Sequence, residues 1–318
     1  MKFRKELFAI LLTTVLVLTW NKLENRQRTT IKTTVKNEKS LDQKNAKTGM
    51  TKLIEVDTVC DVMLNIITTF PVLNSNDDLN ERGFFRRSLV QFEKRQMDFV
   101  QSLLLNMQHP CVERIHLLVD NMAVEDYIKT HNLTKPYTSE IKKMVHFHKL
   151  SHYPTYNDYA KYTNENLMKK TIAVMNADVS LGNGFDLIKM RYLTEGKVAY
   201  CLTRHPTLLA NCKSYTAKAI CAEPYNGSHD VHVFYMDTAF DDWSLNFLTF
   251  PINRAGVENL FMYVIKKRLK KNILNPCSIL KTHHNHCSGI RSRYTSTRLD
   301  RGVNLTYSTH VGYSTKLV

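Results

Sequence analysis

Residues 170–181 read KTIAVMNADVSL, and this segment is the most informative one for the fold. Thr171–Met175 is a run of β-branched and apolar residues, which is typical of a strand buried on both faces in a parallel sheet. The triplet Asn176-Ala177-Asp178 follows it directly. Because ligands of open α/β sheets bind outside the carboxyl ends of the strands, we expect Asp178 to face a ligand and to hold a hard cation. A plain turn residue is the alternative interpretation.

Further strands and helices are predicted on both sides of this stretch. Buried or alternating apolar runs predict strands before it, at residues 59–70, 114–120 and 143–149, and after it, at residues 197–202, 229–235 and 247–250. Apolar residues at helical spacing predict a helix that ends near Met107, with Asp98 on its outer face, and a polar helix is expected over residues 156–168. Strands joined by helical crossovers predict an α/β fold, a doubly wound and mainly parallel sheet flanked by helices.

The N-terminus has the features of a signal anchor. A basic tail (residues 1–6) precedes Leu7–Trp20, which carries no charge and ends without a small-residue cleavage site. We expect a transmembrane helix over residues 7–22, with the tail in the cytosol and the rest in the lumen of the Golgi or endoplasmic reticulum. The uncharged run is shorter than the roughly 20 residues of a typical span, so a cleaved signal peptide is the alternative.

The remaining chain divides into a stem, one large domain and a tail. Residues 23–55 are rich in Asn, Thr and Lys and are expected to be a disordered stem. Residues 56–293 suffice for one domain with a substantial core, and residues 294–318 are expected to form a loosely attached tail. The net charge is +15, but much of the excess lies in the stem and in KKRLKK at residues 266–271. We therefore expect no nucleic-acid partner.

Sequons and cysteines agree with a luminal domain. Three sequons predict N-glycosylation, at Asn132, Asn226 and Asn304. Seven cysteines fit an oxidising compartment. The disulfide pairs that we expect are Cys277 with Cys287, and two of the three residues Cys201, Cys212 and Cys221.

Several short motifs follow one another along residues 59–292. The most specific are NADV at 176–179, FP-x4-GVEN at 250–259, NP at 275–276 and KTHHNH at 281–286. Together they resemble the nucleotide-diphospho-sugar glycosyltransferases of the GT-A fold, in particular the membrane-anchored eukaryotic members. The resemblance implies a luminal enzyme that moves a sugar from a nucleotide sugar, most often a UDP-sugar, to a glycan, glycoprotein or glycolipid acceptor.

A divalent cation, Mn²⁺ or Mg²⁺, is the cofactor that the resemblance implies, because the leaving diphosphate needs a Lewis acid. Asp178 is the first expected ligand, and His286 or His283 the second. Most such enzymes have D-x-D where this chain has the uncharged Asn176. We expect Asn176→Asp to keep or strengthen metal binding, and Asp178→Ala to leave the fold intact. Two alternatives for the histidines are a solvated turn and a zinc site of Cys277, His283, His286 and Cys287.

Other residues are assigned to the nucleotide and to proton transfer. Asp120 is expected to accept from the base or ribose, and Arg204 to face the diphosphate; a turn residue and a surface ion pair are their alternatives. Glu258, in the first turn of a helix, is the expected catalytic base, unless it only complements the helix N-terminus. The alternative base is Asp237, and Asp241 and Asp242 are the next candidates after it. Asp120, Asp178 and Glu258 are expected around one cleft.

Two other functions remain open. Asn176 fits a non-catalytic luminal carbohydrate-binding or scaffold protein with a degenerate transferase fold. A sulfotransferase would also be a basic, membrane-anchored luminal protein. It needs a glycine-containing phosphate loop after its first strand, and Thr68-Thr69-Phe70-Pro71 has no glycine.

Overall fold

The computed structural model describes residues 59–73, 89–121, 123–130, 144–207, 212, 221, 229–288, 299, 307 and 309–318. The chain divides into two compact units, Met1–Asp57 and Thr58–Val318, and every described residue belongs to the second. The expected anchor, the stem and the three sequon asparagines lie outside the described residues. Within the described part of the chain, no helix is long and apolar enough to cross a membrane.

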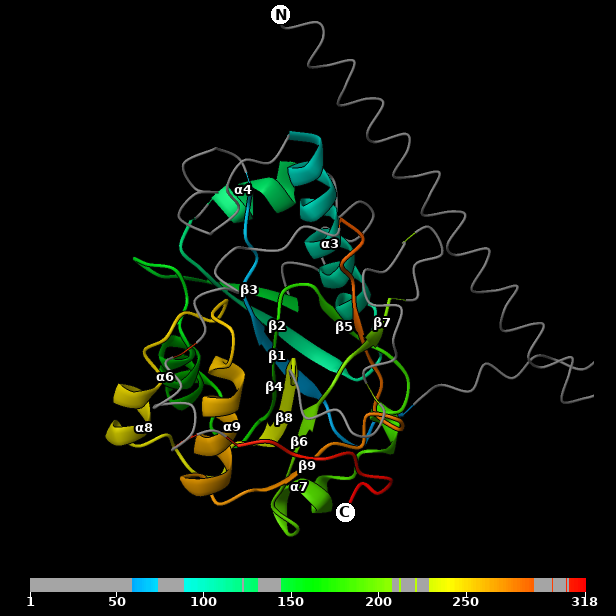
Figure 1. Cartoon of the computed structure of the whole chain (residues 1–318), viewed down its shortest axis with the longest axis vertical. Helices are drawn as coiled ribbons and strands as arrows, with labels where there is room; N and C mark the ends of the chain where they lie inside the picture. The colour runs from blue at the N-terminus through cyan, green and yellow to red at the C-terminus, as the bar shows by residue number, and fades with distance from the viewer. Residues whose placement is uncertain are drawn as a thin grey trace, which may run out of the picture. The chain divides into compact units, whose positions relative to one another are not determined.

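A mixed sheet forms the centre of the second unit (Figure 1). Within the described residues it has seven strands, in the spatial order β3 (Val145–Lys149), β2 (Val112–Val119), β1 (Leu64–Thr68), β4 (Thr171–Met175), β8 (Val231–Tyr235), β6 (Val198–Leu202) and β9 (Asn272–Leu274). Only β8 runs antiparallel to its neighbours in this set, β4 and β6. The prediction of an α/β fold with a mainly parallel sheet is confirmed.

The strand order reverses at β1. β2 and β3 extend from one side of β1, whereas β4 pairs with its other side. In open α/β sheets such a reversal opens a crevice at the carboxyl ends of the two strands, and ligands bind there. In this chain those ends are Thr68 and Met175, and Asn176 to Asp178 follow the second of them.

Helices cover both faces of the sheet, and the sheet divides the core into two layers. Successive strand residues point to opposite faces, so Ala173 and Met175 of β4 enter one layer, and Ile172 and Val174 enter the other. The first layer also contains side chains of α3 (Leu89–Met107), α4 (Ala123–Thr130) and α7 (Met190–Thr194). The second contains those of α6 (Tyr156–Asn166), α8 (Asp242–Phe247) and α9 (Val257–Lys267), which lie together in Figure 1.

A second, small sheet joins distant segments. Its described strands are β5 (Val179–Leu181), β10 (Thr282–His284) and β7 (His205–Pro206), in that order. β10 pairs antiparallel with β5, which places His284 opposite Val179. Since β5 begins directly after Asp178, this pairing brings the C-terminal histidine-rich segment to the carboxyl end of β4.

The structure differs from the predicted elements in two places. Residues 247–250 are no strand, because α8 (Asp242–Phe247) covers their start. The Asp241 side chain caps this helix by accepting a hydrogen bond from the backbone N of Ser244 (2.9 Å), which is a common helix start. The second strand that follows the predicted one, β5 (Val179–Leu181), was not expected; the turn at Asn176 to Asp178 separates it from β4.

The expected disulfide pairs are wrong. Cys60 is bonded to Cys111, Cys212 to Cys287 and Cys221 to Cys277, whereas Cys201 is a buried free thiol in β6. An extended segment rises about 3.3 Å per residue, and β10 lies between Cys277 and Cys287. The strand carries Cys287 away from Cys277 to α3, where its backbone N donates to Asp98 Oδ1 (2.9 Å).

The last ten residues are hydrogen-bonded to the domain, so the expectation of a loosely attached tail is wrong for residues 309–318. The backbone N of Ser314 donates to the carbonyl of Asn275 (2.9 Å), just after the edge strand β9. The Tyr200 hydroxyl donates to the carbonyl of Leu317 (2.9 Å). The segment thereby satisfies backbone groups beside a strand at the edge of the sheet.

Two histidines are buried against the sheet in their neutral form. His232 of β8 is 1% exposed and meets the Phe261 ring edge-on, with 5.2 Å between centroids. Burial, with a smaller effect of His229, lowers the pKa of His232 to about 3. His116 of β2 is 3% exposed, and burial, followed by His146 and Arg114, lowers its pKa to about 4.

Acid should therefore destabilise the fold. The unfolded state takes up these protons near pH 6.5 and the folded state only near pH 4 and 3. The stability is fully present above about pH 6.5 and falls as the pH drops below it. Each histidine should remove about 2 kcal/mol of unfolding free energy between pH 7 and pH 5.

His232→Phe tests this expectation by denaturant unfolding at both pH values. The variant should lose less stability on acidification than the wild type, by one histidine's contribution. His310→Gln, at an exposed position, is the matched control and should follow the wild type. An unchanged pH dependence in His232→Phe would contradict the assignment.

Candidate metal and nucleotide site

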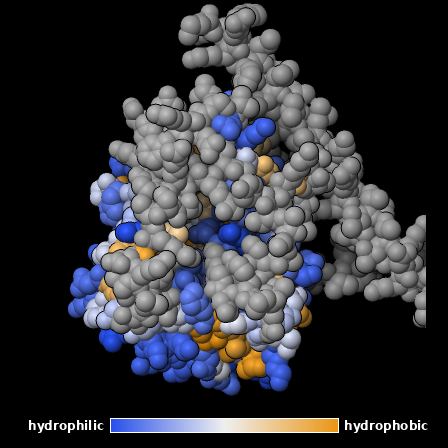
Figure 2. Space-filling model, viewed as in Figure 1, coloured by the Kyte–Doolittle hydropathy of each residue, from blue (hydrophilic) through white to orange (hydrophobic). Residues whose placement is uncertain are grey.

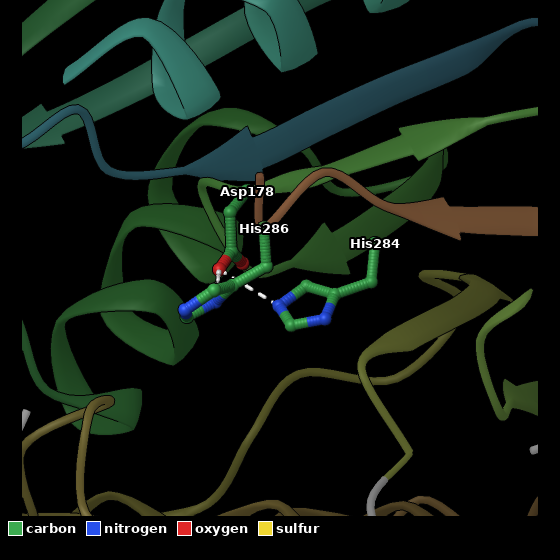
Figure 3. A group of neighbouring side chains, drawn as sticks. All are labelled: Asp178, His284 and His286. Atoms are coloured by element: carbon green, nitrogen blue, oxygen red, sulfur yellow. Dashed lines mark hydrogen bonds and ion pairs between the residues drawn. The ribbon is translucent and has the colours of Figure 1, made fainter. Parts of the chain in front are cut away.

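Asp178 and two histidines converge at the carboxyl end of β4 (Figure 3). Asp178 is 7% exposed, and its Oδ2 lies 2.9 Å from His284 Nε2 and 3.7 Å from His286 Nδ1. One possible ligand atom from each residue lies within 4.8 Å of the other two. Among the described residues, this is the one group of three or more such side chains with metal-binding geometry.

The pairing of β5 with β10 explains why these residues meet. The backbone N of Asn285 donates to the carbonyl of Asp178 (2.7 Å), which holds the two segments together. Side chains alternate along an extended chain, so His284 and His286 reach the same side of the small sheet.

His283 points elsewhere. Its Nδ1 lies 2.9 Å from the carbonyl oxygen of Pro206. Of the two histidines expected from the sequence, His286 therefore lies beside Asp178 and His283 does not, whereas His284 was not among the predicted residues. The spacing of two between His284 and His286 was the signal that could have found it.

The charges in this group suit a metal site. Burial opposes the ionisation of Asp178, but His284 and Arg95 hold the pKa of its carboxyl well below its usual range. Burial lowers the pKa of His286, so its ring is neutral at pH 7. Ionised carboxylates and neutral imidazoles are the forms that coordinate metals. Asp178 and His286 thus have the forms that coordinate a metal.

Arg95 of α3 is a further partner of Asp178, and the sequence analysis missed it. Its Nη2 donates to Asp178 Oδ2 (2.6 Å) and its Nη1 to Asp98 Oδ2 (3.2 Å). Asp98 is 1% exposed, so its predicted position on the outer face of the helix is wrong. Asp98 also accepts from the hydroxyl of Ser288 (2.6 Å), and it thereby joins α3 to the segment that carries the two histidines.

Asn176 belongs to a neighbouring polar group. Its Nδ2 donates to Asp230 Oδ1 (3.0 Å), and Nη1 of Arg204 donates to the same oxygen (2.9 Å). Asp230 directly precedes β8, whose first residue Val231 pairs with Met175. Arg204 therefore lies at the carboxyl end of β4, bonded to a buried aspartate rather than exposed in a surface ion pair.

Glu258 lies close to this second group. It is in the first turn of α9, and its Oε2 accepts from the backbone N of Gly256 (3.0 Å). Gly256 has a φ of 94°, a conformation that favours glycine. Burial raises the pKa of Glu258, Asp230 adds to the shift, and Arg204 opposes it. Asp230, which accepts from Asn176, and Arg204 therefore both act on the charge of Glu258. Asn176 is two residues before Asp178.

The structure does not bring the other candidate bases to this end of the sheet. β8 runs antiparallel to β4, so Asp237 lies beyond the start of β4. At that end the backbone N of Met236 donates to the carbonyl of Lys170 (2.9 Å). There Asp237 accepts from Nζ of the buried Lys271 (2.7 Å). Asp241 caps α8 and pairs with Arg268, and Asp242 is exposed in α8.

Asp120 follows the carboxyl end of β2. Since β2, β1 and β4 are parallel, Asp120 is on the same edge of the sheet as Asp178. Figure 2 shows hydrophilic residues in a hollow near the middle of the drawn face, where the same view in Figure 1 shows β2 and β5.

Asn176→Asp should lower the stability of the folded protein and should not strengthen metal binding, which is contrary to the expectation from the sequence. The substitution replaces the amide that donates to Asp230 by a carboxylate facing it. Loss of a hydrogen bond to a charged group costs about 1.5–3 kcal/mol, and like charges add repulsion. We expect a lower midpoint of thermal unfolding and no gain in Mn²⁺ affinity. Asn176→Ala removes the donor without adding charge, and its midpoint should lie between those of the wild type and Asn176→Asp. Tighter Mn²⁺ binding by Asn176→Asp would restore the original expectation.

Comparisons with known proteins give little guidance. No known protein family matches the sequence, and no curated protein does. Among solved structures, the chain is similar to a UDP-glucose pyrophosphorylase complexed with UDP-glucose, with 10% identity and a TM-score of 0.26, over 46% of this chain and 58% of that one. It is also similar to HddC from Yersinia pseudotuberculosis, with 9% identity and a TM-score of 0.25, over 55% and 75%. This chain thus spans a little more than half of the pyrophosphorylase.

Proposed function

We propose that this protein is a metal-dependent glycosyltransferase that uses a nucleoside-diphosphate sugar. The observation that carries the proposal is the meeting of Asp178, His284 and His286 at the carboxyl end of β4, next to the strand-order reversal at β1. That position is where open α/β sheets bind their ligands. The resemblance of the NADV, GVEN and KTHHNH motifs to GT-A enzymes supports the same assignment.

Asp178, His284 and His286 would hold the cation. A bound divalent ion supplies Lewis-acid stabilisation of the leaving diphosphate. Mg²⁺ prefers an all-oxygen shell, whereas two of these three side chains are imidazoles, so Mn²⁺ is the ion that we propose. Arg204, beside Asp230 at the same end of β4, supplies positive charge for the diphosphate, and Asp120 an acceptor for the base or ribose.

Glu258 would act as the base of an inverting transfer. Its carboxylate takes the proton of the acceptor hydroxyl, while the acceptor oxygen bonds to the anomeric carbon and the bond from that carbon to the diphosphate breaks. The raised pKa of Glu258 moves its proton affinity toward neutral pH, where a general base is most effective. Asp230 and Arg204 set the electrostatic surroundings of this carboxyl.

We also propose that the domain is luminal and anchored by residues 7–22 in a Golgi or endoplasmic reticulum membrane. Three disulfides among the described cysteines support an oxidising compartment. A glycan, glycoprotein or glycolipid in the lumen would be the acceptor.

Donor hydrolysis by the purified full chain tests the proposed function. A panel of nucleotide sugars is incubated with Mn²⁺ or with chelator, and free nucleoside diphosphate is measured. Hydrolysis of one donor that stops in chelator supports the proposal. No thermal shift with UDP and Mn²⁺, together with no turnover on any donor, would favour the scaffold alternative. A response only to a sulfotransferase's adenylate donor would replace the proposal.

A further inference from the structure

Arg95 is held in the site by contacts on several sides. Asp178 and Asp98 accept from its two terminal nitrogens, the Phe99 ring lies 4.5 Å from its guanidinium carbon, and His286 Nδ1 is 3.1 Å from its Nη1. The Arg95 side chain is 9% exposed. Its Nε is buried without a hydrogen-bond partner among the described residues. A buried guanidinium with an unused donor is unusual, because such groups are normally satisfied.

Arg95 and a metal ion would require the same oxygen. The Oδ2 atom of Asp178 accepts from Arg95 at 2.6 Å and is also the atom nearest to His284 and His286. A divalent ion bound there would lie close to a guanidinium, and the two positive charges repel each other strongly when shielded from water. A cation that binds this oxygen would therefore displace the Arg95 guanidinium from it.

The diphosphate of a nucleotide is the partner that Arg95 can turn to. Its planar fork binds phosphate oxygens in pairs, and Asp98 holds the guanidinium at its other side. Asp98 also accepts hydrogen bonds from the hydroxyl of Ser288 and the backbone N of Cys287. Its carboxylate therefore remains hydrogen-bonded when Arg95 shifts.

We propose that Arg95 couples nucleotide binding to metal binding. In the free protein Arg95 neutralises Asp178; when a nucleoside diphosphate enters, Arg95 hydrogen-bonds to the phosphate oxygens and releases Asp178 to the cation. This inference rests on the proposed function. Because coupling between two ligands is reciprocal, the nucleotide strengthens metal binding as much as the metal strengthens nucleotide binding.

Mn²⁺ titration of the full chain, followed by electron paramagnetic resonance of free Mn²⁺ with and without UDP, tests the inference. In the wild type, UDP should tighten Mn²⁺ binding by about 5- to 150-fold, the usual range of such coupling. Equal Mn²⁺ affinity with and without UDP overturns the inference, and this comparison needs no variant.

Direct contact between Mn²⁺ and the diphosphate would also couple the two ligands, so a pair of variants separates the causes. Arg95→Gln removes the competing charge and should bind Mn²⁺ alone roughly tenfold tighter or more, with weaker UDP binding and less coupling. Arg95→Lys keeps the charge but loses the fork, so its binding of Mn²⁺ alone should stay weak. Near-ultraviolet circular dichroism confirms that both variants are folded.

The outcomes distinguish this inference from the proposed function. Wild-type Mn²⁺ affinity in Arg95→Gln, or undiminished coupling, makes Arg95 a structural residue and overturns the inference alone. Binding of neither Mn²⁺ nor UDP by any of the three proteins overturns the proposed function and this inference together.

Discussion

Asp178→Asn should lower the rate of sugar transfer by on the order of 100- to 1000-fold, the usual effect of losing a group that stabilises charge in the transition state. Asparagine keeps the shape of the side chain and removes its charge. We expect Mn²⁺ binding to weaken in parallel, because the two histidines alone offer no anionic ligand. The measurements are turnover with saturating donor and the Mn²⁺ dissociation constant in the presence of UDP.

Asp178→Ala is a poor test of the same role, although the sequence favoured it. Asp178 is buried and accepts from Arg95 and His284. Alanine leaves these buried donors without their acceptor, at about 1–3 kcal/mol, whereas asparagine keeps an acceptor oxygen, so Asp178→Ala tests folding as well as chemistry. Asp242→Asn, an exposed position in α8, is the matched control for loss of a carboxylate. Near-normal turnover of Asp178→Asn in chelator would exclude the metal role.

Glu258→Gln should reduce turnover by about 100- to 10,000-fold, the range that general bases contribute, and leave the affinity for UDP unchanged. Glutamine keeps the acceptor that receives the hydrogen bond from Gly256 but cannot take a proton. In the wild type, turnover should rise with pH through the raised pKa of Glu258, since a base acts when deprotonated. That rise should be absent from the residual activity of the variant.

Asp237→Asn is the companion experiment, because the sequence left Asp237 open as the base. Its position beyond the start of β4, paired with Lys271, predicts that its turnover stays within a few-fold of the wild type. A loss in Asp237→Asn equal to that in Glu258→Gln would contradict the assignment of the base to the carboxyl end of β4.

The scaffold alternative has a specific structural basis in Asn176. Its amide donates to Asp230, which also accepts from Arg204, so Asn176 has a structural role where a D-x-D enzyme has a carboxylate. His284 and His286 provide two further donors beside Asp178. The donor set thus contains three residues without Asn176, and we favour an active enzyme for that reason.

The features that depend on a local pattern could be predicted from the sequence. The buried run Thr171–Met175 predicted β4, and the polar triplet after it placed Asp178 at the carboxyl end of a strand. Glu258 was likewise placed in the first turn of a helix. Periodicity and burial along one segment suffice for such assignments, because side-chain direction follows from the backbone of that segment alone.

Contacts between distant residues could be assigned only from the three-dimensional structure. The register of β10 against β5 selected His284 over His283, the direction of β8 separated Asp237 from the site, and α3 supplied Arg95 and Asp98. The disulfides also depend on the tertiary structure, because none of the three joins two cysteines that were expected to pair. Each of these contacts depends on pairing between segments far apart in the chain, and a shift of one residue in register turns every side chain to the other face.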